Sequence, residues 1–175
     1  MRKIPLSVAV ALMLLAAWPG EVAAQLTDQQ MAQRVAATIR SYRGYTVYDW
    51  IELRANNRAV TLTGCVTDQF KRDEIGQRVA KLEGVLSVSN QIRVLPFSAL
   101  DQSLRQQIST AMFSHPLFWN YAQMSPPPIH IIVENSRVTL EGSVNSDAEG
   151  KLANSLARGV DGTLTVTNNL KVTGR

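Results

Sequence analysis

The sequence predicts an α+β protein of two tandem αββαβ domains, each with a three-stranded mixed sheet and two helices packed on one face of that sheet. Residues 59–94 recur without a gap as residues 137–172. Within each copy, apolar residues spaced by three or four positions alternate with segments in which every second residue is apolar. The first pattern is typical of an amphipathic helix and the second of a strand. A repeat of this length indicates a duplicated structural unit.

The repeat also predicts the domain boundaries. The offset between the copies is 78 over the hairpins and everything after them, but 73 over the first helices. The second copy therefore carries five extra residues between its first helix and its first strand. We expect a first domain over residues 25–95 and a second domain over residues 96–175, with residues 94–98 forming the short linker between them.

In the first copy, a helix is expected to begin at Thr27 or Asp28, because either residue can cap it. Met31, Val35 and Ile39 recur every four residues and form its buried face.

A hairpin is predicted next. Residues 51–53 and 60–64 alternate between apolar and polar and flank a turn at residues 55–58. Asp68 is expected to cap a second helix that ends at Gly84. Equivalent elements are expected at the matching positions of the second copy.

A third strand is predicted over residues 86–94. Asn90 and its counterpart Asn168 interrupt the apolar alternation of this strand. They can contact a ligand or satisfy local backbone groups, and their recurrence in both copies favours the backbone role.

The N-terminus predicts export. Arg2 and Lys3 precede an apolar run that ends at Trp18, and small residues follow up to Ala24. This is the pattern of a cleavable secretory signal over residues 1–24. The run is shorter than the ~20 residues that a membrane-spanning helix needs. We therefore expect an exported protein.

Charge and cysteine content narrow the function further. Without the signal, 16 basic and 13 acidic residues remain, which is too mild a surplus for a nucleic-acid-binding protein. Cys65 is the only cysteine, so no internal disulfide can form. It can act as a reactive thiol, but its place in a strand favours a packing role.

Enzymatic chemistry has little support. The two histidines, His115 and His130, have no carboxylate between them, and no nucleophile, phosphate-binding or dinucleotide-binding motif is present. We expect a protein that is not an enzyme and has no catalytic residues, metal or cofactor.

Both copies resemble the BON domain. The pattern is Val-Thr-Leu-x-Gly-x-Val, an amphipathic helix, and then Gly-x-Leu-x-Val-x-Asn-x-(Ile/Leu)-x-Val, within residues 27–94 and 98–172. A signal followed by two such domains is similar to the periplasmic dual-BON proteins of envelope or osmotic stress. The resemblance implies an αββαβ fold, no enzymatic activity and binding to phospholipid surfaces. Some relatives are lipoproteins, and this chain lacks the cysteine that would carry the lipid.

A candidate contact surface lies in the five-residue insertion and the helix before it. Residues 106–133 carry no Asp, Glu, Lys or Arg, yet they are rich in large apolar side chains. Aromatic residues at matching positions in both copies, such as Tyr45 with Phe118 and Tyr48 with Tyr121, are best explained as core. Trp119 matches Thr46, so the scaffold does not require an indole there.

The candidate membrane- or partner-binding residues are Phe113, Leu117, Phe118, Trp119 and Met124. Exposed tryptophan suits the bilayer interface, and the expected partner is an anionic phospholipid surface. Two alternatives remain open. Trp119 can instead pack against the first domain, and the same surface can bind unfolded clients or other envelope proteins.

Overall fold

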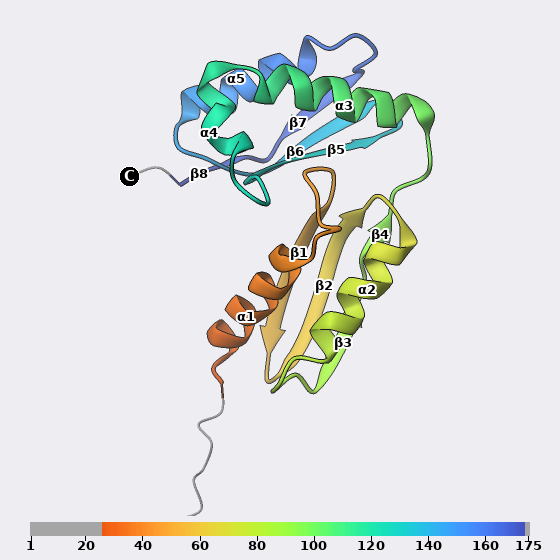
Figure 1. Cartoon of the computed structure of the whole chain (residues 1–175), viewed down its shortest axis with the longest axis vertical. Coiled ribbons are helices and arrows are strands. Elements are labelled where there is room, and N and C mark those ends of the chain that lie inside the picture. Colours follow the sequence, from red (N-terminus) through yellow and green to blue (C-terminus); the bar gives the residue numbers. More distant parts are fainter. Residues whose placement is uncertain (1–25, 174–175) are drawn as a thin grey trace, which may run out of the picture.

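The computed structural model describes residues 26–173, and the predicted signal lies outside them. Two αββαβ units follow one another along the chain (Figure 1). The first unit contains α1 (Asp28–Ser41), β1 (Trp50–Asn56), β2 (Ala59–Val66), α2 (Gln69–Ala80), β3 (Ser87–Asn90) and β4 (Arg93–Val94).

The second unit repeats this order and adds two short helical turns. It contains α3 (Ala99–Phe113), the 3₁₀ helix η1 (Pro116–Phe118), α4 (Trp119–Ala122), β5 (Ile129–Glu134), β6 (Arg137–Val144), α5 (Asp147–Arg158), β7 (Thr165–Asn168) and β8 (Lys171–Val172). The added turns lie in the predicted insertion.

Each sheet is mixed, as predicted. β1 pairs antiparallel with β2, and β2 pairs parallel with β3 and β4. The second unit has the same pairings among β5, β6, β7 and β8. The predicted third strand is thus one strand with a break, and its two pieces pair with the same neighbour.

The strand break has the same geometry in both units, because one asparagine stabilises it in each. Asn90 Nδ2 donates to the Arg72 carbonyl oxygen at 2.9 Å, and its Oδ1 accepts from the Ile92 amide at 3.3 Å. Asn168 makes the same two bonds, to the Gly150 carbonyl and from the Leu170 amide. Backbone satisfaction, the favoured interpretation of these residues, is confirmed.

Side-chain caps begin the main helices. Thr27 accepts from the Gln30 amide and forms a capping box, and Asp68 accepts from the Lys71 amide at 2.9 Å. The predicted end of the second helix was four residues too late, because α2 ends at Ala80. Gly84 lies in the following turn, where its φ of +91° explains the glycine.

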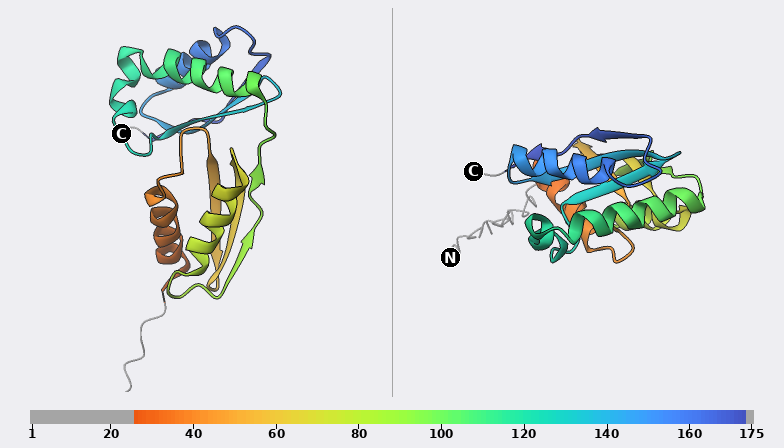
Figure 2. Two further views of the ribbon diagram at one scale, coloured as in Figure 1. Left: turned by 45° about the vertical axis from the view of Figure 1, so that its right-hand side comes forward. Right: turned by 90° about the horizontal axis from the view of Figure 1, so that it is seen from above.

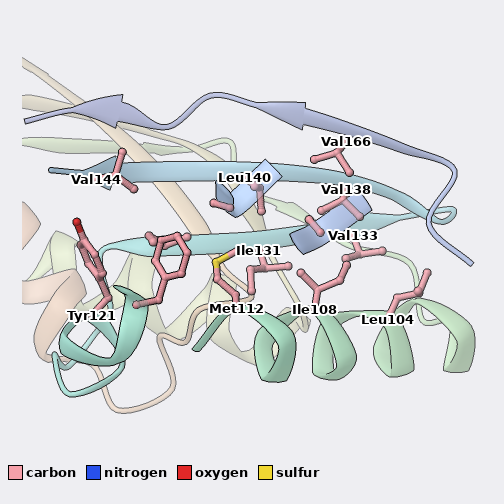
Figure 3. Packing of buried hydrophobic residues seen from close by; sticks show 14 residues of the cluster. Leu104, Ile108, Met112, Tyr121, Ile131, Val133, Val138, Leu140, Val144 and Val166 are labelled. Atoms are coloured by element: carbon pink, nitrogen blue, oxygen red, sulfur yellow. The ribbon is translucent and has the colours of Figure 1, made fainter. Parts of the chain in front are cut away.

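The two helices of each unit cover one face of its sheet and enclose its core (Figure 1). In the second unit, residues of α3 such as Leu104, Ile108 and Met112 meet residues of β5 and β6 such as Ile131 and Leu140 (Figure 3). The fold class predicted from the sequence is therefore confirmed.

The opposite face of the second sheet is partly covered by the first unit. The Ile131 amide donates to the Val47 carbonyl oxygen at 2.7 Å, which joins β5 to the loop before β1. Ile132 packs in a buried cluster with Cys65 and Leu95 of the first unit, against Trp50. Figure 2 shows the loop before β1 reaching this face of the second unit.

Candidate functional site

The segment between α3 and β5 presents large apolar side chains to solvent. Leu117 is 55% exposed, Trp119 is 66% exposed and Met124 is 50% exposed. We call these three residues the 117–124 patch. Most of the Trp119 side chain is open to solvent, so it is not enclosed between the two domains.

Two other predicted site residues lie elsewhere. Phe118 is fully buried in the core of the second unit, so its assignment as a contact residue is wrong. The reason is local, because the 3₁₀ turn at Pro116–Phe118 directs this side chain inward between two exposed neighbours. Phe113 is half-buried and packs against the same core.

The inner side of this segment is held by a network around Tyr121. The Tyr121 hydroxyl donates to the Glu149 carboxylate and accepts from the Asn145 amide at 2.9 Å. Burial and the hydrogen bond to Glu149 raise the pKa of Tyr121 to about 12, so it remains a donor at neutral pH. The side chain of His115 also accepts from the Leu117 amide at 3.3 Å, which fixes the start of η1.

The equivalent loop of the first unit has a different role. Tyr45 and Trp50 lie on either side of His130, with ring centroids 5.3 and 5.2 Å from the imidazole. Tyr48 packs against the core of the second unit, and not against its own as the sequence suggested. In the first copy this loop thus packs against the second unit. In the second copy the equivalent loop faces solvent.

Asp49 stabilises the docking loop. Its carboxylate is fully buried and accepts hydrogen bonds from the backbone and side chains of Thr46 and Thr67. Lys71 Nζ completes the site at 2.8 Å. The buried carboxylate is thus satisfied by protein groups, with the ammonium of Lys71 partly exposed, which indicates a structural role.

Asp101 and Arg105 are the other buried charged residues among those the structure describes. Asp101 accepts from the Asn135 and Ser136 amides at 2.9 and 2.8 Å, in the tight turn between β5 and β6. Arg105 donates to the Val133 carbonyl. Both residues therefore attach α3 to the hairpin.

Cys65 is buried in the junction, and burial raises the pKa of its thiol to about 11. A protonated, covered thiol is a weak nucleophile, which agrees with packing. Within residues 26–173, no cluster of three or more His, Cys, Asp or Glu residues could hold a metal ion. The same residues contain no helix with the length and apolar character needed to cross a membrane.

Among the described residues, six further large apolar side chains are exposed that sequence reasoning did not single out as site residues: Phe70, Leu86, Phe97, Leu100, Leu164 and Val172. Phe97 in the linker is 90% exposed, and Leu100 in the first turn of α3 is 59% exposed. A linker needs no core residue, so the phenylalanine at position 97 was a signal that could have identified this exposed side chain. Phe97 and Leu100 lie at the start of α3, whereas the 117–124 patch follows its end.

Comparison with known proteins agrees with this architecture. Residues 27–96 and 101–174 each match the BON domain. The chain belongs to the BON domain family, with two copies of the domain. A relative in Escherichia coli (strain K12), osmotically-inducible protein Y, is 30% identical over 149 residues, which is 83% of this chain and 73% of the relative.

Two solved structures of CdsD, a structural protein of the type III secretion system of Chlamydia trachomatis, were also matched. Each is 13% identical with a TM-score of 0.28. One is the C-terminal domain, and the match covers 80% of this chain and 96% of that one; the other match covers 81% and 93%.

Proposed function

We propose that this protein is a non-enzymatic periplasmic protein that binds phospholipid membrane surfaces and supports envelope integrity or tolerance of osmotic stress. The observation that carries the proposal is the exposure of Leu117, Trp119 and Met124 on one short segment of the second domain. The osmotic induction named in the Escherichia coli relative supports the physiological part.

The geometry of the patch suits a peripheral contact. The segment is held from the inside by Phe118 and Tyr121, so little chain entropy is lost when the outer side chains enter an interface. An exposed indole fits the bilayer interface, where its ring is in an apolar environment and its N–H stays hydrated.

The strength of the contact can be bounded. Full burial of one large apolar side chain contributes about 1.5–3 kcal/mol, and these three are half to two-thirds exposed. Together they provide roughly 3–5 kcal/mol, which corresponds to weak and reversible binding. Since residues 106–133 carry no charged side chain, attraction to anionic lipid must come from the mild positive charge of the rest of the chain.

The test is co-sedimentation with vesicles that contain anionic phospholipid. Trp119→Ala is expected to weaken binding by about five- to thirtyfold, because about 1–2 kcal/mol of apolar burial is lost. Phe70→Ala is the matched control, since Phe70 is 71% exposed on α2 of the first domain. Equal pelleting of Trp119→Ala and the wild type would exclude the proposal.

A chaperone-like protein-binding role, or a role as an accessory subunit of an envelope complex, uses the same patch. Suppression of the aggregation of a reduced client protein without lipid would distinguish the chaperone-like role. If Trp119→Ala abolishes that suppression while the wild type fails to pellet with vesicles, the patch binds protein and not lipid.

A further inference from the structure

A groove of about 390 Å³ lies between the two domains, and none of the three residues of the 117–124 patch lines it. Its volume is within the range of small-molecule sites, and junctions between domains are common places for such sites. One wall comes from the end of α1 and from β1, and the other from β6, β8 and residues 126–128 before β5. Figure 1 shows the loop before β5 beside the loop that joins α1 to β1.

The walls of the groove are mainly apolar. Ile39, Ile51 and Leu53 line it from the first domain, together with the rings of Tyr45 and Trp50. Three consecutive prolines, Pro126–Pro128, line it from the second domain and add apolar surface with little conformational freedom. An occupant must therefore present an apolar body.

The polar groups of the groove favour an anion. Arg40 and Lys171 both line it, from opposite domains, and neither takes part in an ion pair within the part of the chain that the structure describes. Glu141 is the one carboxylate in the lining, and it already accepts from Asn169 Nδ2 at 2.7 Å. The lining thus has one more positive than negative side chain.

His130 adds a buried aromatic ring to the lining of the groove. This side chain lines the groove and is 4% exposed, with its ring centroid 5.3 Å from that of Tyr45 and 5.2 Å from that of Trp50.

We propose that this inter-domain groove binds a small hydrophobic carboxylate, with its apolar part between the aromatic and proline walls and its carboxylate near Arg40 and Lys171. The site is distinct from the patch of the proposed function and does not depend on it. Because both domains contribute, an occupant would also strengthen the junction between them.

Trp50 lines the groove and can report on it. In a Trp18→Phe, Trp119→Phe background, Trp50 is the only tryptophan of the chain. Decanoate is titrated below its micelle concentration, with decanol and decyltrimethylammonium as neutral and cationic controls of the same chain length. We expect saturable changes in Trp50 emission with the order decanoate, decanol, decyltrimethylammonium from tightest to weakest.

Three variants test whether decanoate binds in this groove. Arg40→Met and Lys171→Met should each weaken the binding of decanoate by about two- to fivefold, as loss of an exposed charge partner predicts. Neither variant should change the binding of decanol. Ala36→Leu should obstruct the groove, because Ala36 lines it from α1, and should weaken both ligands. Circular dichroism checks that each variant is folded.

No saturable response of Trp50 to decanoate would overturn the proposal, as would equal binding of the three amphiphiles. Equal decanoate affinity in wild type, Arg40→Met and Lys171→Met would also overturn it. None of these results bears on vesicle binding through Trp119, so the two proposals fail separately.

Discussion

Protonation of His130 is expected to loosen the junction between the two domains. The imidazole belongs to β5 of the second domain and lies between Tyr45 and Trp50 of the first. Burial lowers the pKa of His130 from its ordinary value of 6.5, although backbone groups of Thr46 and Asp49 and the Asp49 carboxylate oppose this shift. The neutral imidazole is therefore the form that fits the junction.

The sign and size of the effect follow from proton linkage. Because the folded-state pKa is lowered, the unfolded chain binds more protons than the folded chain as the pH falls. Stability is fully present above about pH 6.5 and is lost as the pH drops toward the folded-state pKa. One proton changes the free energy of unfolding by at most about 1.4 kcal/mol per pH unit.

The charged groups around His130 offer little stabilisation to its protonated form. Asp49 is the carboxylate that acts on it, and this group is already occupied by Lys71 and by two threonines. Arg40 and Lys171, which line the same groove, do not favour a second positive charge.

The assay is urea unfolding between pH 5 and 7.5, followed by Trp50 emission in a Trp18→Phe, Trp119→Phe background. His130→Phe keeps an aromatic ring between Tyr45 and Trp50 and should remove most of the loss below pH 6.5. His115→Gln removes the other histidine and should retain that loss. The reasoning is refuted if the wild type and His130→Phe lose stability equally as the pH falls.

Two further changes test the local structure. Asp49→Ala should destabilise the protein by about 3–5 kcal/mol, measured by urea unfolding, because it leaves Lys71 without its buried partner; a loss under about 1 kcal/mol would contradict this. Gly142→Ala should cost more than about 1 kcal/mol by thermal unfolding, since its φ is +108° and a Cβ would lie 1.9 Å from the Pro128 carbonyl oxygen. Gly159→Ala, where the nearest atom to a Cβ is 3.5 Å away, is the control and should be near neutral.

Most of the fold could be predicted because its signals are local. The spacing of Met31, Val35 and Ile39 is visible in the sequence, and all three are buried on one face of α1. The duplicated pattern then identified the same elements in the second copy. Asn90 could be interpreted for the same reason, since the groups that it satisfies are set by the strand break itself.

The candidate site could be predicted only in part. The charge-free segment and its extra tryptophan pointed to residues 113–124, and Trp119 is indeed exposed. Adjacent Phe118 could not be separated from it, because a 3₁₀ turn followed by a four-residue helix has no settled periodicity from which a buried face can be derived. Only the backbone geometry decides which neighbour points inward.

The amino-acid sequence by itself determined two α+β units, since the period of apolar residues along a helix or strand depends on near neighbours. The tertiary structure decided which sheet face, among those not covered by helices, is covered by the other domain. β5 is buried on both faces because the first domain lies against His130 and Ile132, whereas β1 keeps the usual alternation. Covering one face of a sheet depends on groups distant in the chain, such as Cys65 and Leu95, and no local pattern encodes that contact.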